Sequence, residues 1–252
     1  MQGIIQRTLY GSEMVTALRG NKWPFQPIQE QLGNINAKYF SANKLQFIFT
    51  YRSQDYGAAD NVTGGKVAFS ANGDTILWRT SSNGVQISQY TSNFVSVPSL
   101  PSDAQIASDK LNNSVFYGAS GSQFYISIDG GKTFTSPSSL GSSTSPFKVI
   151  ANPSITGDVW VSTDVGIFHT TNSGESFIQL PGISQAWAIA LGAPKMSGGY
   201  PAIFIAASFG EQDGYFRSDD EGLNWVQIND AAHGFGSLSA NCLAADSHMY
   251  GR

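Results

Sequence analysis

The stretches SIDGGKTF (residues 127–134), TTNSGESF (170–177) and SDDEGLNW (218–225) are three copies of one turn motif. All three follow the pattern S/T-x-D/N-x-G-x-x-F/W, and their first residues, 127, 170 and 218, are 43 and then 48 residues apart. A motif that returns at such a period is typical of proteins built from stacked supersecondary units, and this period is that of a β-propeller blade. The spacing therefore predicts a propeller.

Each position of this motif, which we call the Asp-box, has a mechanical role. The acid or amide at the third position can accept hydrogen bonds from backbone N–H groups one or two residues on, which clamps a tight turn. The glycine two residues later supplies a positive φ angle, and the closing aromatic residue starts the next strand with a large apolar group. We interpret these residues as structural and not catalytic: Asp129 and Gly131, Asn172 and Gly174, Asp220 and Gly222.

Apolar runs surround each Asp-box in the same order. In the first unit these runs are AQIAS (104–108), SVFYGA (114–119) and QFYIS (123–127) before the motif, and TFTSP (133–137) at its end. The two later units repeat this order, with DVWVST (158–163) and AIFIAA (202–207) as their second runs. Four short strands about every 45 residues, joined by turns rich in Gly, Asn, Asp and Pro, predict four-stranded blades.

Two less regular units flank these three. Residues 66–90 repeat the strand order, but the following YTSNF has lost both the Asp and the Gly of the motif, and a fifth unit begins at SLSANCLAAD (237–246). We therefore expect an all-β fold in which residues 55–252 form a partial β-propeller of about four blades and the start of a fifth. Because a propeller closes its ring to leave no open sheet edge, we expect this to be an incomplete portion of a larger ring.

Residues 1–54 carry no Asp-box and no blade period, and they are rich in Gln, Asn and Lys. We leave this segment unassigned: it is either a native N-terminal extension or non-native or disordered sequence, for example from an unspliced or misassembled gene, and we favour the second. Its start, MQGIIQRTLYGSEM, lacks the continuous apolar region of a secretory signal, so we predict no signal peptide in this chain.

Composition excludes several classes of partner. The net charge is −4 and the pI is about 5.2, which argues against nucleic acid or an anionic membrane, because both need a basic patch. No apolar run approaches the ~20 residues that a membrane span needs. The single cysteine, Cys242, excludes an internal disulfide and a cysteine-based metal cluster, and no two histidines have metal-ligand spacing. We therefore expect no cofactor and no metal.

From about residue 55 onward the chain resembles the carboxy-terminal propeller of glycoside hydrolase family 74, the xyloglucanases and related xyloglucan-specific endo-β-1,4-glucanases. Single Asp-boxes are weak support, because sialidases and sorting receptors also carry them. Longer colinear segments carry the resemblance, above all GYPAIF (199–204) followed by YFRSDDEGLNWVQINDAAHGFG (215–236). The other matching segments are GGKVAFSANGDTILWRTSSNGVQISQY (64–90), ASDKLNNSVFYGASG (107–121), ISIDGGKTF (126–134), GDVWVSTDVGIFHTTNSG (157–174) and IALGAPKMSGGYPAIF (189–204).

This resemblance implies two seven-bladed propellers in tandem, with a cleft between them that holds the branched glucan. It also implies inverting cleavage by two aspartates, one acting as acid and one as base, and both lie upstream of the matching region. We therefore expect a portion of a secreted, extracellular glycosidase whose polysaccharide partner is plant cell-wall xyloglucan. The upstream propeller is missing from this chain, so we assign no catalytic residue here, and we expect the isolated chain to show no hydrolysis and to aggregate through its terminal blades.

Sugars are held by aromatic faces flanked by a few polar groups. Trp187 and the loop with His233 and Phe235 are our candidates for substrate contacts, since they precede or follow strands instead of lying within them; a core role for Trp187 and a turn role for His233 stay open. The tripeptides at Asn61 (NVT) and Asn112 (NNS) fit the acceptor pattern of N-linked glycosylation.

Two other functions are compatible with the blade pattern. A non-catalytic Asp-box propeller that binds carbohydrate or protein is the alternative that we retain. A sialidase would need three arginines to clamp the substrate carboxylate. The propeller region holds only Arg79, Arg217 and Arg252, of which Arg217 lies beside an Asp-box and Arg252 is terminal, so we set this function aside.

Overall fold

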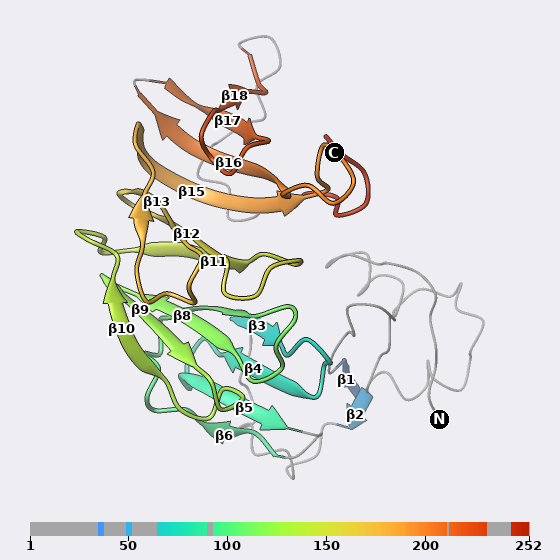
Figure 1. Ribbon diagram of the computed structural model, residues 1–252. Coiled ribbons are helices and arrows are strands. Elements are labelled where there is room, and N and C mark those ends of the chain that lie inside the picture. The colour runs from blue at the N-terminus through green and yellow to red at the C-terminus, as the bar shows by residue number, and fades with distance from the viewer. Residues whose placement is uncertain are drawn as a thin grey trace.

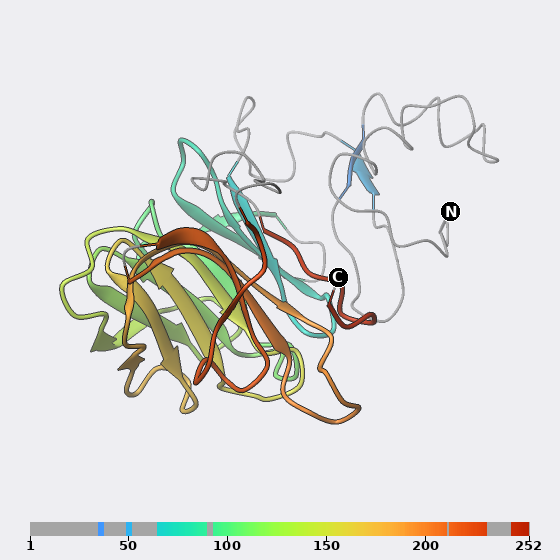
Figure 2. The same cartoon turned by 90° about the horizontal axis from the view of Figure 1, so that it is seen from above.

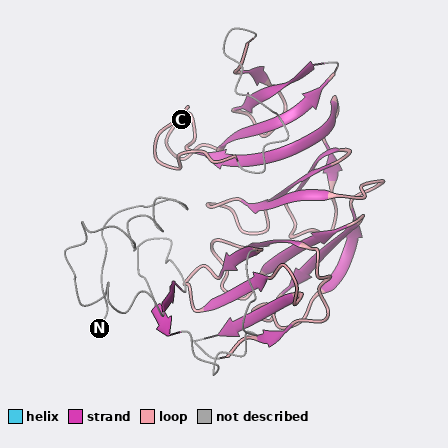
Figure 3. Cartoon of the chain, turned by 180° about the vertical axis from the view of Figure 1, so that it is seen from behind, coloured by secondary structure: helices cyan, strands magenta, loops and turns pink. Residues whose placement is uncertain are grey.

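The computed structural model describes residues 35–37, 49–51, 65–89, 93–210, 212–230 and 243–251. Within these residues every regular element is a strand, as Figure 3 shows, so the all-β prediction is confirmed. In the same part of the chain, no helix offers the length and apolar character that crossing a bilayer requires. The predicted domain boundary near residue 55 lies outside the described residues and stays a prediction.

Four antiparallel sheets of four strands follow one another along the chain (Figure 1). Blade 1 comprises β3 (Lys66–Phe69), β4 (Thr75–Arg79), β5 (Val85–Gln89) and β6 (Val95–Ser96); blade 2 comprises β7 (Gln105–Ser108), β8 (Phe116–Ser120), β9 (Gln123–Ser127) and β10 (Thr135–Ser139). Blade 3 comprises β11 (Pro146–Ala151), β12 (Val159–Thr163), β13 (Gly166–Thr170) and β14 (Ile178–Gln179); blade 4 comprises β15 (Ile183–Gly192), β16 (Ala202–Phe209), β17 (Gln212–Ser218) and β18 (Val226–Gln227). Strands β1 (Ile35–Ala37) and β2 (Phe49–Tyr51) pair in a separate two-stranded sheet.

The blades are arranged like the sectors of a fan (Figures 1 and 2). Their first strands, β3, β7, β11 and β15, lie next to one another in that order. In each sheet the strands then follow in sequence order outward to the short fourth strand. The first strands therefore form the inner side of an incomplete ring, and the fourth strands form its rim. This is the predicted blade architecture.

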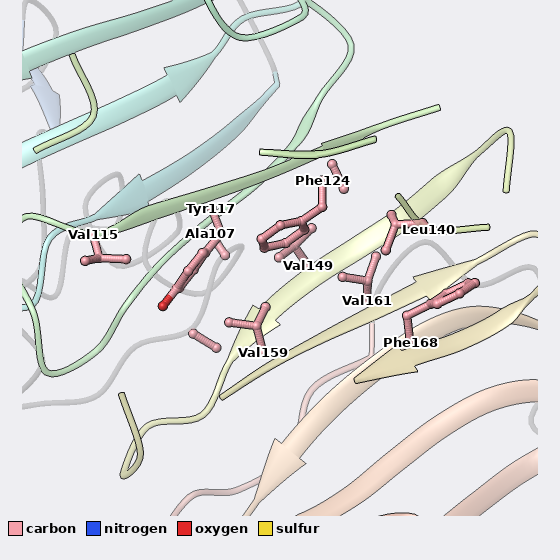
Figure 4. Close-up of a cluster of buried hydrophobic side chains, with 11 residues drawn as sticks. Ala107, Val115, Tyr117, Phe124, Leu140, Val149, Val159, Val161 and Phe168 are labelled. Atoms are coloured by element: carbon pink, nitrogen blue, oxygen red, sulfur yellow. The ribbon is translucent and has the colours of Figure 1, made fainter. Parts of the chain in front are cut away.

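Apolar residues fill the space between neighbouring blades. Between blades 2 and 3, the fully buried Phe124 and Leu140 pack against Val159 and Val161 (Figure 4). Between blades 3 and 4, Trp160 joins a second cluster with Ile189, Ile203 and Ile205. Because side chains alternate across a strand, Val159 and Val161 of β12 face one neighbouring blade while Trp160 between them faces the other. Blade 3 thus contributes to two cores.

Blade 1 forms although its turn motif is degenerate. Its fourth strand, β6, pairs with β5 through the partners Gln86–Ser96 and Ile87–Val95. The ring of Phe94, the last residue of YTSNF, packs edge to face against Trp78 with 5.6 Å between ring centroids. Aromatic packing therefore persists at this corner without the Asp and the Gly of the motif.

Residues 243–251 cover the far side of blade 4. The Ala193 amide donates to the Asp246 carbonyl at 2.7 Å, and Leu243, Ala245 and Tyr250 pack against buried Phe204. The predicted start of a fifth unit, at residues 237–246, is described only in its last residues. Residues 243–251 therefore pack on blade 4 without forming a strand.

Candidate functional site

The first Asp-box is closed by hydrogen bonds to the Asp129 carboxylate. Its Oδ1 accepts from the Ser127 hydroxyl at 2.7 Å and from the backbone amides of Lys132 and Thr133 at 3.0 Å each, while Oδ2 accepts from the Thr133 hydroxyl at 2.6 Å. Ser127 in turn accepts from the Gly131 amide at 2.8 Å. The clamp therefore reaches three and four residues along the chain, and our expectation of one or two residues was wrong.

The other two motifs repeat this geometry with different atoms. The Asn172 Oδ1 accepts from the Thr170 hydroxyl at 2.7 Å and from the Ser176 amide at 3.1 Å. The Asp220 Oδ1 accepts from the Ser218 hydroxyl and from the Asn224 amide, both at 2.8 Å. Both an amide and a carboxylate occur at this position, because either supplies the acceptor oxygen that closes the turn.

The glycines of the motifs fill a second role beside the turn. Gly131, Gly174 and Gly222 have φ angles of 88°, 90° and 83°, which only glycine adopts without strain. A Cβ at Gly174 would also lie 2.1 Å from Phe124 of the preceding blade, and one at Gly222 would lie 2.5 Å from Leu180. The motif therefore brings each turn into close contact with the core that its blade shares with the one before.

Hydrogen bonding lowers the pKa of two Asp-box carboxylates. Burial acts to raise the pKa of Asp129, but the bonds from Thr133, Ser127 and Lys132 outweigh it and lower the value to about 2. Bonds from Asn224 lower the pKa of Asp220 in the same way. A general acid needs the opposite shift, because it must hold its proton near neutral pH. Asp129 and Asp220 are ionised near neutral pH, so they are unsuited to act as a general acid and serve to hold the turns.

Asp164 also serves a turn. Its carboxylate accepts from the hydroxyls of Ser143 and Thr144, at 2.9 and 2.6 Å, and from the Ser145 amide at 3.1 Å. Burial acts to raise the pKa of this carboxyl, but these bonds outweigh it, so the pKa is lowered. It joins the β12–β13 turn to the segment that leads into blade 3.

A buried polar cluster joins blades 3 and 4. The Asp158 carboxylate, 2% exposed, accepts from the Tyr200 hydroxyl at 2.8 Å and lies 3.1 Å from His169 Nε2. Trp160 Nε1 donates to the Tyr200 hydroxyl at 2.8 Å, and its ring stacks on His169 with 3.8 Å between centroids. Burial, reinforced by the bond to Asp158, raises the pKa of Tyr200. The hydrogen-bonding groups of this cluster are paired with one another, and Tyr200 of blade 4 thereby binds to blade 3. We call the cluster the latch between the two blades; its members are Asp158, Trp160, His169 and Tyr200.

Bulges distort the inner strands of blades 3 and 4. In β11 the pairing with β12 skips Phe147, and in β15 the pairing with β16 skips Ser184 and Trp187. A bulge leaves a residue unpaired and redirects its side chain, and such irregularities are frequent next to binding sites. Phe147 and Trp187 are both half-buried, and neither ring packs on another aromatic ring among the described residues.

Our expectation that Trp187 lies outside a strand was wrong. It lies in the interior of β15, between the paired residues Ala186 and Ala188. The bulge adds one unpaired residue there, which explains why the indole is only half-buried although Trp187 lies in the middle of a strand. His233 and Phe235, the other two candidates for substrate contacts, lie outside the described residues, as does Asn61. Asn112 lies in the exposed turn between β7 and β8.

Polar side chains accompany the two aromatic residues on the inner strands. The Lys66 ammonium in β3 donates to the Gln105 side chain in β7 and, at 3.1 Å, to the Phe147 carbonyl in β11. Burial, followed by the charges of Arg79 and Lys148, lowers the pKa of Lys66. We give the name inner-strand surface to five residues that all lie on the first strands of their blades: Lys66, Gln105, Phe147, Gln185 and Trp187. It combines two aromatic rings with two amides and an ammonium group.

Sequence reasoning identified only Trp187 of this surface. Phe147 follows Pro146 in a segment that the sequence predicts as an ordinary first strand, and one unpaired residue leaves no pattern of its own. Lys66 and Gln105 are 39 residues apart, which is the spacing between the first residues of β3 in blade 1 and β7 in blade 2. A blade-by-blade alignment of first strands would have placed them side by side.

Curated proteins and solved structures resemble this chain. It is 43% identical over 201 residues to a xyloglucanase of Hypocrea jecorina, a match that covers 79% of this chain and 24% of that protein. It is 33% identical over 197 residues to the xyloglucanase Xgh74A of Acetivibrio thermocellus, covering 77% of this chain and 23% of that protein. The crystal structure of a Niastella koreensis GH74 enzyme matches with a TM-score of 0.68 and 30% identity, over 81% of this chain and 30% of that one. No family model matches the chain.

The chain spans about a quarter of the length of the curated relatives it matches. Within that span the identity to xyloglucanases extends over blades and connecting turns, and not over the Asp-boxes alone. The likeness to the Niastella koreensis enzyme adds agreement in fold. Sequence and architecture together show that the matched part of this chain belongs to glycoside hydrolase family 74.

Proposed function

We propose that this chain contributes a xyloglucan-binding surface to an extracellular glycoside hydrolase that cleaves the β-1,4-glucan backbone. The bulge at Trp187 carries the proposal, because it leaves a half-buried indole unpaired on the first strand of blade 4, and the first strands of the other blades carry the Lys66 ammonium and the Gln105 amide. An aromatic face with a few polar groups is the combination that binds sugar rings. The names of the relatives, xyloglucanases, supply the substrate class.

We further propose that the chain does not hydrolyse xyloglucan by itself. Inverting hydrolysis needs one carboxyl group that keeps its proton and one that activates water, about 6.5–9.5 Å apart. The carboxylates of Asp129, Asp164 and Asp220 serve turns, and their pKa values are shifted downward. An upstream propeller would supply the catalytic pair.

Calorimetric titration with xyloglucan oligosaccharides tests the binding proposal. We expect the purified chain to bind them and the substitution Trp187→Ala to weaken binding at least about tenfold, since that corresponds to about 1.4 kcal/mol and stacking on an aromatic ring contributes a similar amount. Met196→Ala is the control, because Met196 is exposed in the β15–β16 loop, away from the bulges. Equal affinities for the Trp187→Ala variant and the unmodified chain would refute the assignment.

An assay of reducing ends released from xyloglucan tests the second proposal separately. We expect no release above that of a boiled sample. Release by the purified chain, abolished by boiling, would place a catalytic pair within these residues. Binding with release absent supports both proposals, and release absent with binding absent leaves a structural propeller as the function of the chain.

A further inference from the structure

The turn between β7 and β8 carries the tripeptide Asn112-Asn113-Ser114. It fits the acceptor pattern of N-linked glycosylation, N-x-S/T with x other than proline. All three residues are exposed. A glycan attached here would extend into solvent without displacing any buried group.

Hydrogen bonds hold the backbone around Asn112 in place, but they do not involve its side-chain nitrogen Nδ2, the atom that would be glycosylated. The Asn112 amide donates to Asp109 Oδ1 at 2.8 Å, and its side-chain Oδ1 accepts from the Ser114 amide at 3.0 Å. Its carbonyl accepts from the Val115 amide at 3.3 Å. Among the described residues, nothing accepts a hydrogen bond from Asn112 Nδ2, the atom to which the sugar is joined. The turn therefore uses every polar group of Asn112 except the one that glycosylation needs.

Other asparagines in the described part of the chain lack this combination. Asn113 does not open an acceptor tripeptide, and its Oδ1 accepts from the Asn72 amide at 2.6 Å. Asn152 is followed by Pro153 and Ser154, so proline excludes it, and it is 1% exposed. Asn172 belongs to an Asp-box, and its Nδ2 donates to the Ser176 hydroxyl at 3.0 Å. Asn112 alone among them is in an acceptor tripeptide with an exposed, uncommitted Nδ2.

The position also leaves the inner-strand surface free. Asn112 follows the C-terminal end of β7, and the Ser114 carbonyl accepts from the Gly130 amide of the neighbouring Asp-box at 2.9 Å. Lys66, Gln105 and Phe147 of the inner-strand surface lie at or next to the N-terminal ends of their strands, β3, β7 and β11. First strands of consecutive blades run side by side in the same direction, so these features lie at opposite ends of the blades. A glycan on the Asp-box side would not obstruct a polysaccharide on the other.

We propose that Asn112 carries an N-linked glycan when the chain passes through a eukaryotic secretory pathway. The donor is an oligosaccharide joined to a lipid through a diphosphate. Asn112 Nδ2 attacks C1 of the first sugar, the bond from C1 to the phosphate oxygen breaks, and the lipid diphosphate leaves, while the proton lost by Nδ2 passes to the departing diphosphate or to water.

Secretion of the full chain from yeast behind an added signal peptide tests this proposal. Peptide N-glycosidase treatment followed by mass spectrometry reports each site, because release of the glycan converts the asparagine to aspartate. Asn61→Gln is introduced first, so that the second acceptor tripeptide does not contribute. We expect the Asn61→Gln chain to carry a glycan on the peptide with Asn112, and Asn112→Gln and Ser114→Ala to remove it.

Two matched variants keep the test independent of folding. Asn113→Gln leaves the acceptor pattern intact, and Ser114→Thr replaces one permitted residue with the other, so both should retain the glycan. Loss of the glycan in Asn112→Gln and Ser114→Ala with retention in these two supports the site. An unmodified Asn112 in the Asn61→Gln chain overturns the proposal, and so does a glycan that persists in Ser114→Ala. Neither result depends on whether the chain binds xyloglucan.

Discussion

The hydroxyl of Tyr200 lies 2.8 Å from both carboxylate oxygens of Asp158, and this contact joins the loop before β16 to the turn before β12. Asp158 is buried, so water does not replace a lost partner easily. The same hydroxyl accepts from the Trp160 indole at 2.8 Å. One tyrosine therefore satisfies an acceptor and a donor of the neighbouring blade.

Replacing Tyr200 with phenylalanine should destabilise the chain. The substitution keeps the ring but leaves a buried carboxylate and a buried indole N–H with one partner fewer, which costs about 1–3 kcal/mol in free energy of unfolding. Chemical denaturation monitored by fluorescence measures this. Tyr125→Phe is the matched control, because no hydrogen bond of the Tyr125 hydroxyl is found in the described part of the chain. Equal losses in the two variants would contradict the latch.

Replacing Gly174 with alanine tests the close approach of the Asp-box to the preceding blade. The added Cβ would lie 2.1 Å from Phe124 at a φ angle of 90°. We expect a loss of about 2–5 kcal/mol, since overpacking costs about 1–3 kcal/mol and a left-handed backbone adds about 1–2 kcal/mol.

Gly198→Ala separates these two effects in the same measurement. Gly198 also has a positive φ angle, 75°, but a Cβ there meets nothing within 4 Å. This variant should therefore lose only the backbone contribution. If Gly174→Ala cost no more than Gly198→Ala, packing against Phe124 would not constrain the motif.

Asp129 should make stability depend on pH in the acid range. Its pKa in the folded chain is about 2, below the ordinary value of 3.8, so the folded state favours the ionised form. The stabilisation from Asp129 is complete above about pH 4 and is lost as the pH falls through about 2. Asp129→Asn should therefore destabilise the chain more at pH 5 than at pH 2. Urea unfolding at both values checks this, and an equal cost at both would be contrary to it.

We expect replacement of Asp109, in the turn between β7 and β8, to lower the free energy of unfolding more than replacement of an exposed turn residue. Its carboxylate is buried and accepts from the amides of Leu111 and Asn112, from the Tyr117 hydroxyl at 2.9 Å and from the Gly157 amide of blade 3 at 3.0 Å. Asp109→Ala leaves these donors unpaired, so we expect a loss of at least about 3 kcal/mol.

The comparison for Asp109 is Asp103→Ala. Asp103 is exposed and accepts one hydrogen bond, from the Ser120 hydroxyl at 2.8 Å. We expect this variant to unfold within about 0.5 kcal/mol of the unmodified chain, as is usual for surface substitutions. A small effect at Asp109 would mean that water replaces the carboxylate in the turn.

The blades could be predicted from the sequence because they depend on local patterns. The predicted second strands at 114–119, 158–163 and 202–207 correspond to β8, β12 and β16. The strand order within each blade also follows from the repeat. Each of these features needs only apolar runs and turn residues close together in the chain, and such signals are visible in a single sequence.

The candidate site could be predicted only in part, because it depends on register and on contacts between blades. Trp187 was visible as an aromatic residue, but its place inside β15 required knowing that the strand carries a bulge. The contact of Lys66 with the Phe147 carbonyl joins positions 81 residues apart. Likewise, Asp158 contacts His169 of its own blade and Tyr200 of the next blade, which are 11 and 42 residues away in the sequence. No local sequence pattern indicates these contacts.

The alternation of Val159, Trp160 and Val161 along β12 makes blade 3 a shared wall. Its two faces belong to different hydrophobic clusters. A change that shifts this one strand therefore disturbs the packing of the blades on both sides. In an array where each unit touches only its neighbours, stability is transmitted from one interface to the next. Damage at β12 should therefore divide the fan into two halves, whereas damage at the rim strand of one blade should stay within it.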